Sequence, residues 1–317
     1  MNTPSECIAI LGPTCCWKSA VGLKLAEAYG GEVVSCDSMQ VYRGLDIGTA
    51  KATPDERRRV PHHLIDILDI SEPYDANRFV AFANDALNGI WQRSHKAFLV
   101  GGTGLYARAL IYGFELLPSD TVLFKQLDEQ SHEATGRAAL LEQLEKASVE
   151  LGTQVPEECR LNPRRLVRAC EVLALTGKPP WLLRRKNDAP DSRFKQFCIV
   201  PPLPLIKERI FPRTRMMLEN GWLEEAAKAD QEGLLQTPTA RQALGYADII
   251  HYLHDGQKGG IDSLCELVAN KTVQYARRQL TWFKHQHPGA VMLSPPTADN
   301  AIEWLAEQIT THCTLST

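Results

Sequence analysis

Short, largely apolar runs of residues recur in the first hundred positions of the chain, at 7–11 (CIAIL), 32–36 (EVVSC) and 97–100 (AFLV). Apolar runs of this length predict strands that are buried on both faces, as in parallel sheets. A later run, 196–200 (QFCIV), predicts a further strand that returns to the same sheet.

Helical patterns lie between the first predicted strands. Val21, Leu25 and Ala28 repeat at helical spacing and are followed by the paired glycines 30–31, which favour the end of a helix. The segment 79–90 carries an apolar stripe of the same period. Strand, helix and strand within about thirty residues form a βαβ unit, so we expect an α/β fold with a parallel sheet.

The middle of the chain has a different pattern. Strand-like runs are absent there, and charged segments with helical spacing dominate, at 124–147 and 163–175. A long helical pattern also covers 267–285, towards the end of the chain. The middle segment therefore resembles a helical insertion in an α/β protein.

This change of pattern predicts two domains. The α/β core comprises 1–114 and 196–317 and includes the C-terminal helices. The residues between them, 115–195, form an inserted all-helical domain. We expect the last residues, 310–317, to be a loose tail.

Loops that carry candidate chemistry follow three of the predicted strands. GPTCCWKS (12–19) follows the first strand, Asp37 and Ser38 follow the second, and GGTG (101–104) follows the third. The carboxyl ends of parallel strands meet at one edge of an open sheet, and ligands bind at that edge. We therefore expect these three loops to form one site.

The loop 12–19 is close to the phosphate-binding pattern G-x-x-x-x-G-K-[ST]. Backbone N–H groups and the helix dipole bind the anion in such a loop, the lysine adds a positive charge, and the hydroxyl residue holds Mg²⁺. Gly12, Lys18 and Ser19 fit the pattern, but Trp17 stands where a second glycine is expected. Its indole could strain the loop and crowd the anion, or it could point away and leave the amides usable.

Composition narrows the class of protein. The 317 residues carry a net charge of −3, so any nucleic-acid surface must be local. The nine cysteines have neither a CxxC pair nor the spacing of a zinc site. The first residues do not resemble a signal peptide and no apolar stretch reaches the roughly 18 residues of a membrane span, so we expect a reduced, cytoplasmic protein without a membrane segment.

Two basic groups lie in the predicted insertion. One comprises Arg160, Arg164, Arg165 and Arg168, with no acid among them, and the other lies within 184–195. Local basic surfaces bind nucleic-acid phosphates, although charge runs are more often only solvated faces.

Six blocks of the sequence resemble, in the same order, the signature blocks of tRNA dimethylallyltransferases, the tRNA isopentenyltransferase (IPP transferase) family. They are DSMQVYRGLDIGTAK (37–51), HHLID (62–66), VGGTGLY (100–106), RLNPRRLVRACEV (160–172), RQALGYADII (241–250) and QYARRQLTWF (274–283). The resemblance implies a P-loop NTPase-like parallel sheet flanked by helices, with an inserted helical domain that contacts tRNA.

The resemblance also implies a prenyl-transfer reaction. Enzymes of this family move a dimethylallyl group from dimethylallyl diphosphate to N6 of the adenosine that is 3′-adjacent to the anticodon of tRNA. The phosphate loop would bind the diphosphate of this donor together with Mg²⁺. Its match to a nucleotide-binding, ATP-type motif is no reason to expect that ATP is consumed. The implied partner is the tRNA anticodon stem-loop, and the implied state is a monomer.

Several residues match the family's catalytic and donor-binding positions. Asp37 resembles the base that takes the proton of the adenine N6 amine, and Lys18, Thr103 and Arg213 resemble residues on the diphosphate. Ser19 would hold Mg²⁺. The implied donor-binding loop comprises Gly12, Pro13, Thr14, Cys15, Cys16, Trp17, Lys18 and Ser19.

The resemblance implies a longer set of RNA contacts. Reading of a flipped base and its loop is the expected mode of recognition. The implied tRNA-binding residues are Asp37, Ser38, Met39, Gln40, Thr103, Lys125, Cys159, Arg160, Leu161, Asn162, Pro163, Arg241, Gln242, Ala243, Leu244, Gly245 and Tyr246.

The chain departs from the family in a few places. The family loop reads close to GPTASGKT, so 15–17 (CCW) is unusual, as are Cys159 and Arg215 at their positions. We expect an active enzyme, in which strain at Trp17 would weaken donor binding. Two alternatives are a catalytically impaired tRNA-binding homologue and a P-loop small-molecule kinase, which the RNA-facing blocks disfavour.

Overall fold

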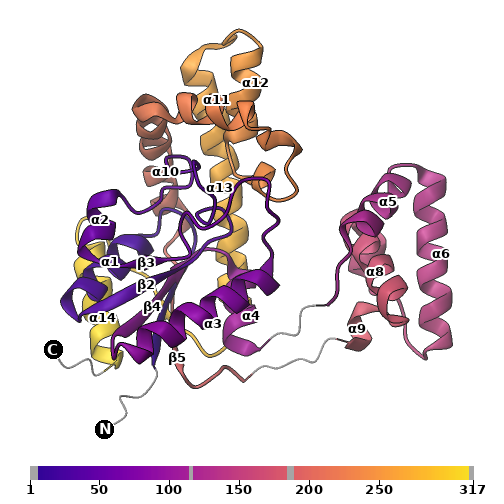
Figure 1. The fold of residues 1–317 in the computed structure, drawn as a ribbon, viewed down its shortest axis with the longest axis horizontal. Coiled ribbons are helices and arrows are strands. Elements are labelled where there is room, and N and C mark those ends of the chain that lie inside the picture. The colour runs from indigo at the N-terminus through magenta and orange to yellow at the C-terminus, as the bar shows by residue number, and fades with distance from the viewer. Residues whose placement is uncertain (1–5, 114–116, 184–188, 314–317) are drawn as a thin grey trace. The chain divides into compact units, whose positions relative to one another are not determined.

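A computed structural model describes residues 6–113, 117–183 and 189–313 of the chain (Figure 1). The chain forms two compact units: Met1–Gly113 with Asp188–Thr317, and Phe114–Asn187. The expected domain boundaries lie near these limits, but the second, after residue 195, falls inside strand β5 (Phe194–Ile199). The assignment of the middle unit to tRNA binding stays a prediction.

A parallel sheet organises the first unit, as predicted. Within the described residues it has six strands in the order β3-β2-β4-β1-β5-β6, and every neighbouring pair is parallel. The strands besides β5 are β1 (Cys7–Leu11), β2 (Gly31–Cys36), β3 (His62–His63), β4 (Lys96–Gly101) and β6 (Val291–Leu293). Strands β1, β2, β4 and β5 confirm the predictions made from the four apolar runs. The sequence patterns missed the two short strands β3 and β6.

Helices cover both faces of this sheet, and further helices extend beyond its edge, where α11 and α12 lie (Figure 1). The helices of this unit are α1 Lys18–Ala28, α2 Pro54–Arg59, α3 Ala76–Gln92, α4 Gly104–Tyr112, α10 Leu203–Met217, α11 Leu223–Gln231, α12 Tyr246–His254, α13 Gly260–Gln286 and α14 Ala301–Cys313. Short helical turns cover Leu218–Trp222, Leu234–Gln236 and Ala240–Gln242. The prediction of a loose tail over 310–317 is wrong as far as Cys313, because α14 is helical to that residue. Residues 314–317 lie outside the described residues.

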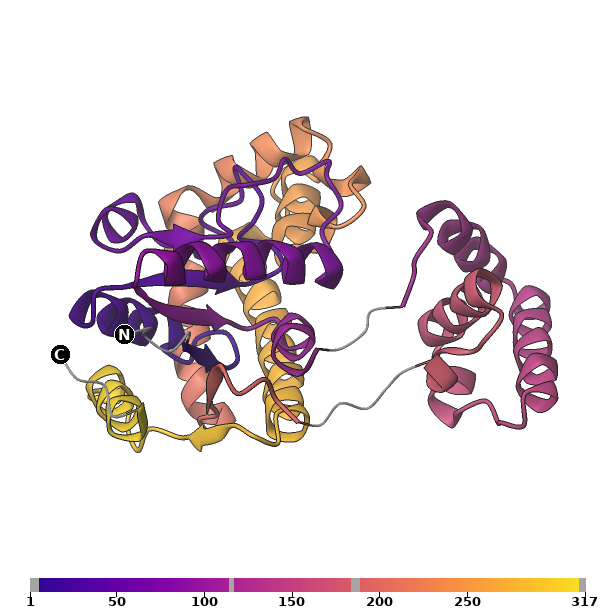
Figure 2. The same cartoon turned by 60° about the horizontal axis from the view of Figure 1, so that its bottom comes forward.

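The main hydrophobic core explains where α1 and α14 lie. Ile8, Ile10 and Val100 on the sheet share one buried cluster with Val21 on α1 and Leu305 on α14. Side chains alternate across a strand, so these two helices cover one face of the sheet. Helix α3 packs on β2 and β4 without joining that cluster and so covers the other face (Figure 2).

Local chemistry sets the ends of these helices. Asp75 caps α3 by accepting a hydrogen bond from the Arg78 N–H at 2.9 Å. Thr53 and Glu56 form a reciprocal capping box at the start of α2. Gly113 closes α4 in the left-handed conformation, with φ 61°.

The described part of the second unit contains helices joined by short loops, and no strand. Its helices are α5 (Thr121–Ser131), α6 (Ala134–Glu150), α7 (Glu157–Leu161), α8 (Pro163–Thr176) and α9 (Pro180–Leu183). The segment 124–147, predicted from a continuous charged pattern, is divided between α5 and α6. The buried core of this unit includes Leu140, Leu144, Val167 and Cys170.

None of the helices in the described part of the chain combines the length and the apolarity that a membrane span requires. All nine cysteines are buried, as expected for small core residues.

Candidate active site

A cavity of about 640 Å³ lies at the edge of the sheet where β1, β2 and β4 end. Its wall includes most of the phosphate loop, the segment 37–40 and the glycines 101–102. Helices α10 and α13 complete the wall with residues that include Arg209, Arg213, Tyr275 and Gln279. The three loops that the sequence predicted to form one site therefore line one cavity.

Close packing fixes the start of the phosphate loop. A Cβ on Gly12 would lie 2.6 Å from the carbonyl oxygen of Ile199 on β5, so only glycine fits there. The Gly12 N–H donates to the Gly101 carbonyl at 3.3 Å, which ties this loop to the glycine loop after β4. Lys18 Nζ donates to the Pro13 carbonyl at 2.9 Å and bends the lysine back over its own loop.

Trp17 takes the conformation that a glycine would take, with its indole packed in the protein. Its φ of 66° is left-handed, and the residue is 6% exposed. The indole belongs to the buried cluster that includes Cys16, Val21 and Leu293. The sequence left open whether the indole crowds the anion or points away from the loop. In the structure the indole packs in the core, and Trp17 still contributes to the cavity wall.

Asp37 lies at the end of β2, where it lines the cavity. Its Oδ1 accepts hydrogen bonds from the backbone N–H groups of Met39 at 2.8 Å and Gln40 at 3.3 Å. Among the described residues no protein group donates to Oδ2. The carboxylate therefore caps the following turn with one oxygen, and the other oxygen has no protein donor.

Thr103 supports this turn from the neighbouring strand end. Its Oγ1 accepts a hydrogen bond from the Ser38 N–H at 3.0 Å, and its own N–H donates to the Cys36 carbonyl at 3.2 Å. Thr103 does not belong to the cavity wall, unlike Gly101 and Gly102. Its hydroxyl positions the segment that carries Asp37.

Two arginines on α10 contact the phosphate loop. Arg213 Nη1 lies 3.4 Å from Thr14 Oγ1 and 3.1 Å from Cys15 Sγ, and Arg209 Nε donates to the Cys15 carbonyl at 3.0 Å. Burial lowers the pKa of Arg209, and the positive charge of Arg213 lowers it further. No carboxylate in the described residues pairs with either guanidinium, so this end of the cavity favours an anion.

Gln279 on α13 joins the phosphate loop to the glycine loop. Its Oε1 accepts from the Thr14 N–H at 2.9 Å, and its Nε2 donates to the Gly102 carbonyl at 2.8 Å. The sequence analysis missed this residue, because nothing in its block showed which of its polar side chains faces inward. The only available pointer was its place in the QYARRQLTWF block.

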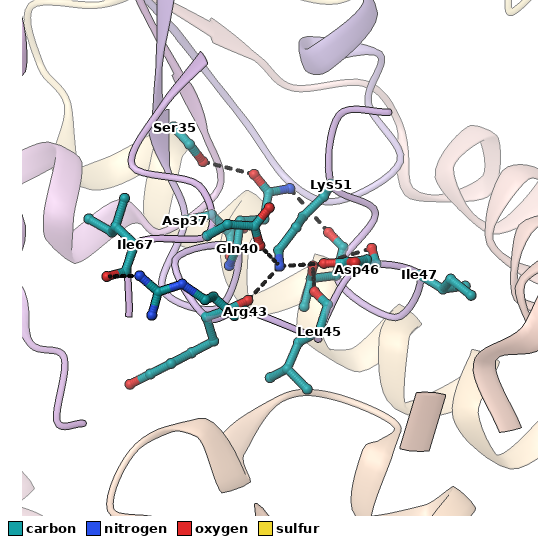
Figure 3. A network of polar contacts seen from close by, with 12 residues as sticks. Ser35, Asp37, Gln40, Arg43, Leu45, Asp46, Ile47, Lys51 and Ile67 are labelled. Atoms are coloured by element: carbon teal, nitrogen blue, oxygen red, sulfur yellow. Dashed lines mark hydrogen bonds and ion pairs between the residues drawn. The ribbon is translucent and has the colours of Figure 1, made fainter. Parts of the chain in front are cut away.

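A buried lysine, Lys51, also belongs to the cavity wall, and Figure 3 shows the polar network around it. Lys51 Nζ donates to the Tyr42 carbonyl at 2.5 Å, to Asp46 Oδ1 at 2.6 Å and to Asp66 Oδ1 at 2.5 Å. Burial raises the pKa of Asp66, but hydrogen bonds from Lys51 and Arg57 outweigh this effect and hold that pKa below its usual value. The segment 40–51 is thus fixed around one buried ammonium group.

A carboxylate from α11 binds the tip of the same segment. Glu225 accepts backbone N–H groups of Asp46 and Ile47 at 2.8 Å and of Gly48 at 3.0 Å. The Tyr246 hydroxyl donates to Glu225 Oε1 at 2.5 Å. Because the same carboxylate also accepts three adjacent amides, Glu225 ties α11 to the loop 45–49.

Oxygen donors that suit Mg²⁺ are present at the phosphate loop. Ser19, at the start of α1, is exposed and lines the cavity together with Asp37. In the described parts of the chain no group of three His, Cys, Asp or Glu side chains could hold a metal alone. Mg²⁺ is commonly bound by one or two protein oxygens plus substrate phosphates, and this donor set fits that mode.

Comparison with known proteins decides the family. The sequence profile described as IPP transferase matches residues 40–286, and the profile described as isopentenyl transferase matches 5–71. A tRNA dimethylallyltransferase from Thermus thermophilus is 39% identical over 309 residues, 95% of this chain and 98% of the relative.

The chain belongs to the tRNA isopentenyltransferase family.

Solved structures of this family have the same fold. The tRNA isopentenylpyrophosphate transferase of Bacillus halodurans is 33% identical, with a TM-score of 0.67 over 97% of this chain and 96% of that chain. A eukaryotic dimethylallyltransferase acting on tRNA is 25% identical, with a TM-score of 0.73 over 91% of this chain and 74% of that chain. The predicted P-loop-like parallel sheet is therefore confirmed.

The predicted RNA-contacting residues of the isopentenyltransferase core occupy different environments. Ser38, Met39, Gln40, Gln242 and Leu244 line the cavity. Within that group the Gln40 side chain is already engaged, since Oε1 accepts from Ser35 Oγ at 2.8 Å and Nε2 donates to the Thr49 carbonyl at 3.1 Å.

The rest of the segment 241–246 varies in exposure. Arg241 is exposed, Ala243 is buried, and Gly245 adopts a left-handed φ of 89°. Tyr246 is fully buried, and its hydroxyl is used by Glu225. Tyr246 therefore supports the loop from behind, and its hydroxyl is turned to the protein.

The predicted RNA-contacting residues of the helical unit are mostly at its surface. Lys125 and Leu161 are exposed, Asn162 caps α8 through the Arg164 N–H at 3.1 Å, and Pro163 is the first residue of that helix. Cys159 is buried, with 7% of its surface exposed.

Most of the described arginines and lysines of the two basic groups are paired with acids, some within the same segment and some from other helices. Arg160 pairs with Glu145, Arg165 with Glu158, and Arg168 with the fully buried Glu171. Of the second group, 184–188 lie outside the described residues, while Arg193 pairs with Asp191 and Lys195 with Glu6. Glu145 and Glu158 lie in other helices than their arginines and Glu6 is far from Lys195 along the chain, so the spacing of charges did not reveal these three partners, whereas Glu171 and Asp191 are only three and two residues from theirs.

Proposed function

We propose that this chain transfers a dimethylallyl group from dimethylallyl diphosphate to N6 of the adenosine that is 3′-adjacent to the anticodon of tRNA. One observation carries the proposal: a single cavity is lined by the phosphate loop, by two guanidinium groups that pair with no carboxylate of the described residues, and by Asp37, whose Oδ2 has no donor among those residues. The first set of groups suits a diphosphate, and the carboxylate suits an amine that must lose a proton.

In the proposed reaction, the adenine N6 attacks C1 of the donor. The N6–C1 bond forms, the bond between C1 and the diphosphate oxygen breaks, and the diphosphate leaves with the bonding electrons. Asp37 takes the N6 proton on the oxygen that Met39 and Gln40 do not use. Thr103 holds the turn of Asp37 in place through the Ser38 N–H.

Positive charge beside the phosphate loop would stabilise the leaving group. Lys18 and Arg213 would bind the diphosphate oxygens, and the backbone of the loop from Gly12 to Ser19 would surround them. Mg²⁺, when bound, would neutralise part of the diphosphate charge, and Ser19 would hold it.

The RNA-binding role is proposed for both units. The core would bind the target base with Ser38, Met39 and Gln40 and the neighbouring nucleotides with 241–246. The helical unit would bind the anticodon stem-loop with Lys125 and the segment 159–163. We further propose that the protein acts as a monomer in the cytoplasm. The match of the IPP transferase profile to 40–286 favours this function over a kinase or an impaired tRNA-binding homologue.

The function is tested by incubating the purified chain with labelled dimethylallyl diphosphate, Mg²⁺ and unmodified tRNA. Transfer of label to the adenosine beside the anticodon, located by nuclease digestion and mass spectrometry, is the expected result. Binding of tRNA without incorporation of label would contradict the proposal and favour a non-catalytic RNA-binding protein. Consumption of ATP without tRNA would favour a kinase.

A further inference from the structure

The guanidinium of Arg209 lies over the indole of Trp17, with its Cζ 4.3 Å from the ring centroid. Its Nε also donates to the Cys15 carbonyl at 3.0 Å. These contacts use the flat face and one edge of the guanidinium, so they fix its plane relative to the phosphate loop. Within the described residues, Nη1 and Nη2 of Arg209 have no protein acceptor.

The positive charge around Arg209 favours binding of an anion. Arg209 and Arg213 both line the cavity, and no carboxylate of the described chain lies within ion-pair distance of either. Burial lowers the pKa of Arg209, and the charge of Arg213 adds to the effect. Two neighbouring cations with unused N–H groups are suited to phosphate oxygens, because a guanidinium edge presents two parallel donors.

We propose that Trp17 is a positioning residue for the prenyl donor: its indole orients Arg209 so that Nη1 and Nη2 bind the diphosphate. The inference rests on the proposed function, which supplies a diphosphate-bearing substrate. It gives a role to the departure of this chain from the family loop GPTASGKT. The loop loses a glycine at position 17 and gains a stacked guanidinium beside the anion.

A simpler role for Trp17 would be to fill space in the buried cluster beside Leu293. In that case any apolar side chain of similar bulk would serve, whether or not it is aromatic. Phenylalanine and leucine separate the two roles. Both carry a Cβ and so bear the same strain at the left-handed φ of 66°, but only phenylalanine can stack on Arg209.

The experiment compares Trp17→Phe and Trp17→Leu in the full chain, by calorimetric titration with inorganic diphosphate and Mg²⁺. We expect Trp17→Phe to bind within about 2-fold of the unchanged protein and Trp17→Leu to bind about 3- to 30-fold more weakly, the range of a lost cation–π contact. The KM for dimethylallyl diphosphate should rise by the same factor. The KM for tRNA and kcat should change less than about 2-fold.

A second pair of variants tests whether the effect passes through Arg209. With Arg209→Ala present, the Phe and Leu variants should bind diphosphate equally. Two results would overturn the inference. One is that the Phe and Leu variants bind diphosphate equally when Arg209 is present, and the other is that their difference in diphosphate binding persists in the Arg209→Ala background. Thermal unfolding of each variant checks that it is folded.

The same experiment separates failure of the inference from failure of the proposed function. If the unchanged protein transfers label to tRNA but the Phe and Leu variants bind diphosphate equally, the proposed function stands and the role of Trp17 is rejected. Unchanged protein that transfers no label rejects the function, while the comparison with inorganic diphosphate still decides whether Trp17 orients Arg209.

Discussion

Single residues set the backbone of the phosphate loop. Cys15 and Trp17 both have left-handed φ values, 61° and 66°, although neither is glycine. Each such residue costs about 1–2 kcal/mol of strain. The buried indole, and a stack on Arg209 that contributes about 0.5–2 kcal/mol, offset this cost. A bulky residue is therefore tolerated where a glycine is expected.

Replacement of Trp17 by glycine tests this balance. Loss of a buried tryptophan costs about 3–5 kcal/mol, and relief of strain returns about 1–2 kcal/mol. Trp17→Gly should therefore lower the free energy of unfolding in urea by about 1–4 kcal/mol, although it restores the family's glycine at this position. An unchanged or increased free energy of unfolding would show that the indole contributes little packing.

Two carboxylates, those of Glu225 and Glu32, join separate elements of the core, one beside the carboxyl ends of the strands and one at their amino ends. Glu225 from α11 binds three amides of the loop after Asp37, beside the cavity. Glu32 lies at the start of β2, at the amino end of the strands. Arg93 donates to it at 2.7 Å, and rings of His63 and His95 lie 2.6 Å from its oxygens.

The hydrogen bonds of Glu225 to the amides of 46–48, here called the Glu225 clamp, have a matched control in the preceding residue, Glu224. Glu225→Ala leaves the amides of 46–48 without their acceptor, so we expect a loss of about 2–4 kcal/mol in the free energy of unfolding. Glu224→Ala, at an exposed position on the same helix, should cost less than about 0.5 kcal/mol. Equal losses measured by urea unfolding would reject the clamp.

Glu32 predicts a pH dependence at the other end of the sheet. Burial raises the pKa of Glu32, but hydrogen bonds from Arg93, His63 and His95 outweigh it and lower that pKa from 4.5 to about 2. A carboxyl whose pKa is lower in the folded state stabilises the fold above its unfolded pKa, and this contribution is lost as pH falls. The stabilisation should thus be complete above about pH 4.5 and vanish towards pH 2.

The measurement compares unchanged protein with Glu32→Gln across that range. At pH 6 the variant should be less stable, by on the order of 3 kcal/mol. The difference in free energy of unfolding should shrink as the pH falls from about 4.5 towards 2. A difference that stays constant through this window would mean that the charge of Glu32 is not what its three partners stabilise.

At the scale of the whole molecule, the long elements and the site edge could be predicted from the sequence. The strands β1, β2, β4 and β5 are local apolar runs, and each loop of the site directly follows its strand. The strands β3 and β6 have two and three residues, too few for a pattern to be visible. The helical unit could be predicted from its charged helical pattern. The break between α5 and α6 could not, because the pattern runs continuously through 124–147.

The residues that the sequence analysis missed act through distant contacts. Gln279 is 265 positions from Thr14, and Glu225 is 177 positions or more from the amides that it binds. Arg209 contacts Cys15 and Trp17 from another helix. No local periodicity reports such pairs, because they arise only when the sheet brings its loops to α10, α11 and α13.

The most direct test of the account is the single-turnover rate of dimethylallyl transfer to tRNA by Asp37→Asn. Loss of a general base should lower that rate by about 10²- to 10⁴-fold, while tRNA affinity stays within about 2-fold. Asp299→Asn, at an exposed position, serves as the control and should leave the rate unchanged. A near-normal rate for Asp37→Asn would contradict the assignment of Asp37 as the group that takes the proton.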